Sequence, residues 1–266
     1  MLAALLPTIC YFIVNRYSAS AIQMPKHYFP DSIVEIKKRG RITEDTIWHK
    51  VGDFKLVNQL GDSVTWDQLK GKIVIADFFF THCPNICPMM TFNMKRLQES
   101  IHNGQRVGDR ANKKIHFISI TVDPERDSVQ RLKHWGDRFQ IDPEKWWLLG
   151  GDKKTIYDLA IEDIKLPTID GKGVDTSFFH SEKIILIDSN RHVRGFYNGL
   201  DSVALSRITK DIVLLTMEKD PSKKSFLAGK LQIIAVAVLL AIIAVGLFLF
   251  IFQKNQTNAA TGLEKK

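Results

Sequence analysis

The sequence predicts an α/β fold, in which helices flank a central sheet that is parallel at least in part. Segments with strand character alternate with segments of helical periodicity along most of the chain. One strand segment, residues 73–80, reads as a continuous apolar run, which is typical of a strand buried on both faces. The composition agrees with a globular protein, because 45% of the 266 residues are hydrophobic and 25% are charged.

The expected elements follow one another between residues 53 and 217. Strand-like runs are found at 53–57, 63–66, 73–80, 114–122, 146–149, 183–187 and 193–197. The last two are expected to form a hairpin around Ser189 and Asn190. Helical patterns are found at 89–100, 128–139, 154–162 and 203–217. Residues 22–50 contain two prolines and little periodicity, so we expect an extended or loosely folded lead-in.

The C-terminal part of the chain contains a predicted transmembrane helix. Residues 233–252 form a run of twenty residues without a polar side chain. Such a run matches the length of about 20 residues that a bilayer core requires. Lys230 and Lys254 bracket the run, and three lysines precede it while three follow it, so lysine counting leaves the orientation open.

The N-terminal segment is apolar from Leu2 to Val14 and is followed by the small residues 19–21. A cleaved signal peptide and an uncleaved membrane anchor both fit this pattern. Either one would place residues 22–229 outside the cytoplasm. The expected organisation is a signal or anchor (1–21), a lead-in (22–44), a folded domain (45–218), a linker (219–230), a transmembrane helix (231–252) and a tail (253–266).

The net charge of +8 does not indicate a nucleic-acid-binding protein. Half of the positive excess lies in the two end segments, where basic residues favour contact with a membrane surface. No stripe of basic and aromatic residues accompanies it, so we expect no nucleic-acid partner. The three cysteines are too few for a disulfide scaffold, a zinc ribbon or a four-cysteine iron–sulfur site.

The segment that carries chemistry is residues 80–88, FTHCPNICP, between a buried strand and a helix. Cys83 and Cys87 have the spacing of one face of a helical turn, with Cβ atoms about 5–6 Å apart. Thiols at that separation can close a disulfide after modest adjustment, or converge on one metal ion. Free N–H groups at a helix start lower thiol pKa values and favour the thiolate that both reactions need. The alternative is a pair of buried structural cysteines.

A third ligand decides which metal would suit the pair. Two thiolates and one imidazole suit copper(I), whereas zinc would want a fourth ligand. Of the eight histidines, His180 is the best candidate, because it lies between the glycine-containing stretch 171–177 and the strand at 183–187. A loop that enters a central strand can carry a side chain across to the start of a helix. A merely packed or solvated histidine is the alternative.

Three motifs resemble the Sco/SenC family of copper-delivery proteins. They are FTHCPNICP at 80–88, TVDPERD at 121–127 and the dipeptide at 180–181, and they occur in the family's order and spacing. The resemblance extends over about residues 45–218. It implies a thioredoxin-like fold, with a central mixed sheet flanked by helices.

The resemblance also implies a site and a role. One copper ion, Cu(I) or Cu(II), would be held by Cys83, Cys87 and His180, and the two cysteines could also pair as a redox disulfide. The protein would deliver copper to the dinuclear copper centre of cytochrome c oxidase during assembly, and would not be a turnover enzyme. Its partners would be the apo oxidase subunit that carries this centre, a thiol reductant protein and the membrane. The domain would lie on the periplasmic side of a bacterial inner membrane.

The sequence departs from the family pattern at two positions. Asn85 and Phe179 stand where the family often has aspartate. The second change removes a carboxylate that would support His180. Asp123 is a candidate for a negative charge near the site, although it equally fits a turn or the start of a helix.

Two other functions are alternatives to copper delivery. A thiol–disulfide oxidoreductase that keeps partner cysteines reduced also fits two cysteines at a helix start. It is disfavoured because three residues separate the cysteines, where dedicated oxidoreductases have two, and because no proline stands beside the strand at 183–187. A peroxidase of the peroxiredoxin type would need a single activated cysteine with a nearby arginine, which this cysteine pair does not resemble.

Overall fold

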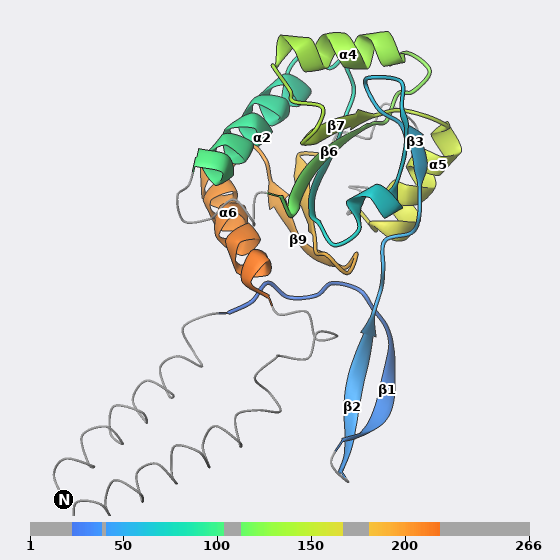
Figure 1. Ribbon diagram of the computed structural model, residues 1–266, viewed down its shortest axis with the longest axis vertical. Helices are drawn as coiled ribbons and strands as arrows, with labels where there is room; N and C mark the ends of the chain where they lie inside the picture. The colour runs from blue at the N-terminus through green and yellow to red at the C-terminus, as the bar shows by residue number, and fades with distance from the viewer. Residues whose placement is uncertain (1–22, 39–40, 104–112, 167–180, 219–266) are drawn as a thin grey trace, which may run out of the picture. The chain divides into compact units, whose positions relative to one another are not determined.

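The structure, a computed structural model, describes residues 23–38, 41–103, 113–166 and 181–218 (Figure 1). In these residues the main sheet has five strands in the order β7-β6-β5-β8-β9. They are β5 (Ile73–Phe79), β6 (Ile115–Thr121), β7 (Trp146–Leu149), β8 (Lys183–Ile187) and β9 (Val193–Asn198). β5, β6 and β7 are parallel, whereas β8 is antiparallel to both β5 and β9. The predicted α/β fold with a partly parallel sheet is confirmed.

Alternate side chains of β5 enter cores on opposite faces of the sheet. One core is covered by α2 (Ile86–Asn103), α4 (Val129–Arg138) and α6 (Ser202–Met217). The other is covered by β3 (Lys55–Val57), β4 (Ser63–Thr65), the 3₁₀ helix η1 (Trp66–Leu69), α5 (Lys153–Asp158) and the π-helical turn η2 (Leu159–Asp163). Figure 1 shows α2 and α6 on one side of the sheet and α5 on the other. The continuous apolar run of β5 is explained by this burial on both faces.

The helices occupy the predicted segments, with shifted ends. α2 begins at Ile86, three residues earlier than expected, because Pro88 fits a first turn whose backbone N–H groups lack helical partners. α4 begins after Ser128, whose hydroxyl oxygen accepts a hydrogen bond from the Arg131 N–H at 3.4 Å. The single helix expected at 154–162 is instead divided between α5 and η2.

The lead-in is more ordered than predicted. It contains an antiparallel hairpin of β1 (Pro30–Lys38) and β2 (Arg41–Trp48). β-branched residues pair across it, Ile33 with Thr46 and Ile36 with Thr43, and such pairs stabilise a sheet. Charged and apolar residues occur on both faces, so the alternation that normally reveals a strand is missing from the sequence.

The membrane segments expected from the sequence lie outside the described residues. This applies to the N-terminal segment 1–21, the linker 219–230, the transmembrane helix 231–252 and the tail 253–266. Among the residues that the structure does describe, no helix combines the length and the apolar character needed to cross a bilayer.

Substitution of two methionines of α2 can test which face of this helix is buried. Met94 is fully buried against the sheet, whereas the side chain of Met89 is 51% exposed. We expect Met94→Ala to lower the free energy of unfolding by about 2–5 kcal/mol, because it leaves a cavity in a packed core. Met89→Ala, the matched control, should change it by no more than about 0.5 kcal/mol. Denaturant unfolding of the two variants measures the difference, and equal losses would contradict the assigned orientation of α2.

Candidate metal centre

The two cysteines lie where β5 leads into α2. Cys83 is in the connecting loop, three residues before the helix, and Cys87 is the second residue of α2. Both side chains are buried, and they are free thiols. The N–H of Cys87 points to the Cys83 sulfur at 3.4 Å. The sulfur of Cys83 therefore caps the helix from outside it, rather than sharing a helical turn with Cys87 as the spacing had suggested.

The surroundings of Cys83 favour its thiolate. Burial opposes ionisation, but hydrogen bonds from the backbone N–H groups of Cys87, Asn85 and Ile86 and from the Cys87 thiol outweigh it. The pKa of Cys83 is consequently below its ordinary value of 9.0. This is the effect that the sequence predicted for a thiol at a helix start.

The same expectation is wrong for Cys87. Burial is the largest influence on this thiol and raises its pKa. Its hydrogen bond to Cys83 and the negative charges of Cys83 and Asp77 raise it further. The pair therefore consists of one thiol that ionises readily and one that holds its proton.

Asp77 is a buried carboxyl group in β5 that sequence reasoning missed. The Ser119 hydroxyl donates to its Oδ1 atom, and the indole N–H of Trp146 donates to that hydroxyl at 2.9 Å. The Oδ2 atom has no hydrogen-bond partner among the described residues. Burial raises the pKa of Asp77 to about 7. The available signal was a single acidic residue inside an otherwise apolar strand.

Asp127 holds the loop that carries Cys83. Its buried carboxylate accepts hydrogen bonds from the N–H of Thr81 at 3.0 Å, from the Thr81 hydroxyl and from the Thr121 hydroxyl. The sequence had raised Asp123 as a candidate charge near the site. Asp123 forms a turn, the other interpretation that the sequence left open: its carbonyl oxygen accepts the N–H groups of Arg126 and Asp127, and its carboxylate pairs with Arg126 at 2.6 Å.

A basic cavity of about 380 Å³ lies beside the cysteine loop. Its lining is formed by Thr81, His82, Ser128, Gln130, Arg131, His134, Trp135 and Arg138. The ring of His82, next to Cys83 in the sequence, contacts the Arg131 guanidinium and lies 3.6 Å from Asp127. The surface next to the cysteines is therefore suited to an acidic partner.

The third predicted ligand, His180, lies outside the described residues. The described chain resumes at Ser181, and β8 begins at Lys183. Because β8 runs antiparallel to β5, it starts at the end of the sheet where β5 leads to the cysteines. The structure thus brings Cys83 and Cys87 together and places Ser181 and Glu182, which lead into β8, at the same end of the sheet.

A mixed sheet with a cysteine pair at the start of the helix after its central strand defines a thioredoxin-like domain with a dithiol site. The chain belongs to the SCO1/SenC family, whose family model matches residues 44–215. The SCO1 protein homolog of Bacillus subtilis is 29% identical over 174 residues, which cover 65% of this chain and 86% of that protein.

Solved structures agree with this assignment. A SCO1/SenC family lipoprotein from Bacillus anthracis is 29% identical with a TM-score of 0.54, and the match covers 63% of this chain and 95% of that chain. BsSco, a member of the Sco family of cytochrome c oxidase assembly proteins with a disulfide switch, is 28% identical with a TM-score of 0.54. That match covers 64% of this chain and 95% of BsSco. Yeast Sco1 with copper bound shares the fold at 19% identity with a TM-score of 0.50, and the match covers 66% of this chain and 98% of yeast Sco1.

The unequal thiols give a labelling prediction. In the reduced, metal-free protein, a small alkylating reagent should modify Cys83 at a lower pH than Cys87, because only the Cys83 thiolate is stabilised by hydrogen bonds. Cys87→Ala removes one of these bonds and should slow Cys83 labelling at neutral pH about tenfold, since a hydrogen bond to a charged group contributes about 1.5–3 kcal/mol. Mass spectrometry of the labelled peptides measures both rates.

Met89→Ala serves as the control for this experiment, because Met89 is also at the start of α2 but its side chain is exposed. Its Cys83 labelling rate should equal that of the wild type. Faster labelling of Cys87 than of Cys83 would show that the order of the two pKa values is wrong.

Proposed function

We propose that this protein binds one copper ion at Cys83, Cys87 and His180 and delivers it to the dinuclear copper centre of cytochrome c oxidase during assembly. The observation that carries this proposal is the pair of buried, reduced thiols at the start of α2 in a SCO1/SenC family member. The copper bound to yeast Sco1 and the oxidase assembly role of BsSco's family support it.

The proposed ligand atoms suit copper as the ion that the protein transports. Thiolates are soft ligands that select copper(I), and the hydrogen bonds that lower the pKa of Cys83 make its thiolate easier to form. Cys87 must release its proton when the metal binds, so uptake of copper should release protons and weaken at low pH. Three protein ligands leave a position through which the ligands of an acceptor can enter and take the ion.

His180 is the ligand that the topology of β8 supports. It directly precedes Ser181, at the end of the chain segment that enters β8 beside the cysteine-bearing loop. The proposed copper-binding domain is residues 45–218. The apolar segments 1–21 and 231–252 would tether it to a membrane, with the domain on the extracytoplasmic side.

Anaerobic reconstitution with copper(I) tests the three ligands. Wild type should bind one equivalent of copper with a matching loss of free thiols, and Cys83→Ser and Cys87→Ser should fall well below one equivalent. His180→Ala should weaken binding at least tenfold, because even indirect partners of a metal ligand typically contribute about 10–100-fold. The control is His134→Ala, an exposed histidine of α4. Full affinity of His180→Ala for both copper(I) and copper(II) would exclude His180 as a ligand.

A second candidate is a thiol–disulfide reductase that keeps the cysteines of the acceptor reduced. The observation in its favour is the unequal pair of thiols. The Cys83 thiolate would attack a partner disulfide and release one partner thiolate. Cys87 would then lose its proton and attack the mixed disulfide, which leaves Cys83 and Cys87 oxidised and both partner cysteines reduced.

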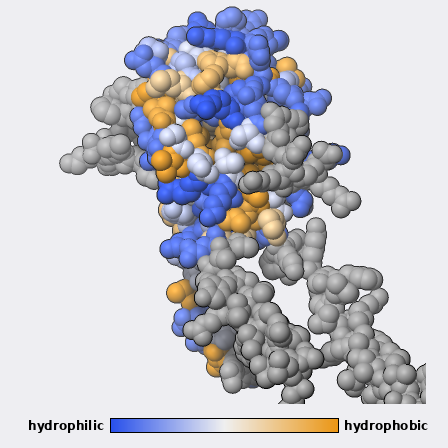
Figure 2. Space-filling model, turned by 90° about the vertical axis from the view of Figure 1, so that its left-hand side faces the viewer, coloured by the Kyte–Doolittle hydropathy of each residue, from blue (hydrophilic) through white to orange (hydrophobic). Residues whose placement is uncertain are grey.

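An exposed apolar pair on α2 is the proposed docking surface for the acceptor. Met89 and Phe92 are 51% and 56% exposed and lie on the first turns of the helix that carries Cys87. Figure 2 views the molecule from the side of α2 and α6 and shows apolar patches among polar ones there. The basic cavity at Arg131 and Arg138 would complement an acidic rim on the partner.

Phe92→Ser separates docking from metal binding. Because Phe92 lies on the surface, the variant should bind copper as the wild type does but transfer it to the apo oxidase subunit several-fold more slowly. Transfer is followed by the absorption of the filled centre, and Val203→Ser, an exposed apolar position on α6, is the matched control. Unchanged transfer by Phe92→Ser would remove this surface from the proposal. Rapid reduction of the subunit's disulfide by metal-free protein, without copper transfer, would favour the reductase.

A further inference from the structure

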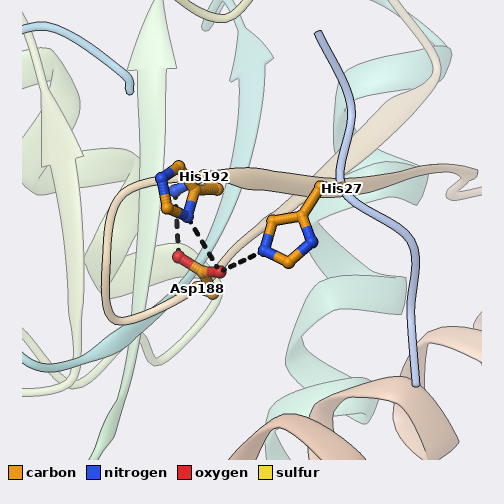
Figure 3. A group of neighbouring side chains, drawn as sticks. All are labelled: His27, Asp188 and His192. Carbon is orange, nitrogen blue, oxygen red and sulfur yellow. Dashed lines mark hydrogen bonds and ion pairs between the residues drawn. The ribbon is translucent and has the colours of Figure 1, made fainter. Parts of the chain in front are cut away.

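A second group of metal-ligating side chains lies away from the cysteines. His27, Asp188 and His192 each offer a ligand atom, and these atoms lie within 4.8 Å of one another (Figure 3). His27 comes from the segment that precedes β1, while Asp188 and His192 flank the turn between β8 and β9. Neither the three family motifs nor the proposed copper site uses any of them.

The cluster and the cysteines are at opposite ends of the sheet. Asp188 follows Ile187, which pairs with Val74 near the start of β5, whereas Cys83 follows the other end of β5. The seven residues of β5 span roughly 20 Å at about 3.3 Å per residue. A metal ion in one place cannot share ligands with an ion in the other.

The separations suit a metal ion. In a tetrahedral zinc site with bonds of about 2.0–2.2 Å, neighbouring ligand atoms lie roughly 3.3–3.6 Å apart. The Oδ2 atom of Asp188 is 3.8 Å from His27 Nε2 and 3.5 Å from His192 Nδ1. Small rotations of the two rings would bring all three atoms to bonding distance of a common centre.

The carboxylate is fixed in place by its other hydrogen bonds. Its Oδ1 atom accepts the N–H groups of Asn190 and His192, both at 2.9 Å, and Oδ2 accepts the guanidinium of Arg194 at 2.9 Å. Burial opposes the ionisation of Asp188, but hydrogen bonds from the His192 ring, the His192 backbone N–H and Arg194 outweigh it and lower the pKa to about 2, so the group is ionised. Arg194 uses one lone pair of Oδ2 and leaves the other on the side of the imidazoles, and such outer partners commonly orient metal ligands.

The imidazoles are also held. The ring of His27 stacks on Trp48 with centroids 5.0 Å apart and lies 5.3 Å from the ring of His192. The buried Nδ1 atom of His192 faces the Oδ2 atom of Asp188 at 3.5 Å, a long contact that lacks good hydrogen-bond geometry. A contact of that length satisfies a buried ring nitrogen poorly, and a metal ion between the ring and the carboxylate would satisfy it better.

We propose that His27, Asp188 and His192 form a second metal site, for a divalent ion of the zinc class. Two imidazoles and one carboxylate are a common ligand set for such ions, and it lacks the thiolates that favour copper(I). The ion would join the segment before β1 to the β8–β9 turn. That segment is already attached there, because the Tyr28 N–H donates to the Val193 carbonyl at 3.0 Å and Arg194 donates to the Pro25 carbonyl at 2.7 Å.

The test uses the full chain with Cys83→Ser and Cys87→Ser, which removes the proposed copper site. Cobalt(II) is titrated as a spectroscopic probe and then displaced with zinc(II). We expect one equivalent of cobalt with the intense visible absorption of a low-coordinate site, and complete displacement by zinc. This outcome is independent of whether the cysteines bind copper.

His27→Gln and His192→Gln, each added to this background, should weaken cobalt binding at least tenfold. His134→Gln, which alters an exposed histidine of α4, should leave it unchanged. Zinc should also raise the melting temperature of the background protein but not of His27→Gln, whose fold is checked by circular dichroism. Absence of stoichiometric uptake, or uptake that is equal in His27→Gln and the background, would show that the cluster is only a set of ion pairs and would overturn the proposal.

Discussion

The position of the dithiol depends on one buried carboxylate, that of Asp127. The loop from Phe80 to Asn85 has no regular structure, so its backbone must be fixed by partners outside it. The carboxylate of Asp127 is such a partner, because it accepts hydrogen bonds from the N–H and the hydroxyl of Thr81, two residues before Cys83. It also accepts the hydroxyl of Thr121 and so connects the loop to the end of β6. Hydrogen bonds to a charged acceptor are among the strongest in proteins. The parallel pairing of β5 with β6 places the two strand ends at the same edge, which makes this connection short.

Once the loop is fixed, the start of α2 makes the two sulfurs unequal. Cys83 receives hydrogen bonds from backbone N–H groups of the first turn, and these stabilise its thiolate. Burial raises the pKa of Cys87, whose thiol donates a hydrogen bond to Cys83 and whose anion would be repelled by Asp77. The two thiols therefore ionise in sequence, Cys83 before Cys87. The ionisation of Cys87 would occur when a metal ion or a disulfide exchange compensates for the second negative charge.

The main sheet and the cysteine pair could be predicted from the sequence, because both leave local signals. The apolar run at 73–80 marks a strand buried on both faces, and the spacing of Cys83 and Cys87 marks a shared site. The β1–β2 hairpin could not be predicted, because its two faces mix polar and apolar residues. The roles of Asp77 and Asp127 depend on contacts with residues 42 and 46 positions away, Ser119 and Thr81, which no local pattern encodes.

β8 relates the two proposed metal sites to each other. Its first residues come from the segment that contains His180, while its last residue leads into Asp188. One short strand beside the central β5 would therefore contribute a ligand at each end: an imidazole beside two thiolates at one, and a carboxylate beside two imidazoles at the other. Soft and borderline ions would be separated by ligand type as well as by distance. An ion at the Asp188 end would stabilise the fold without competing for the copper that the thiolates would hold for transfer.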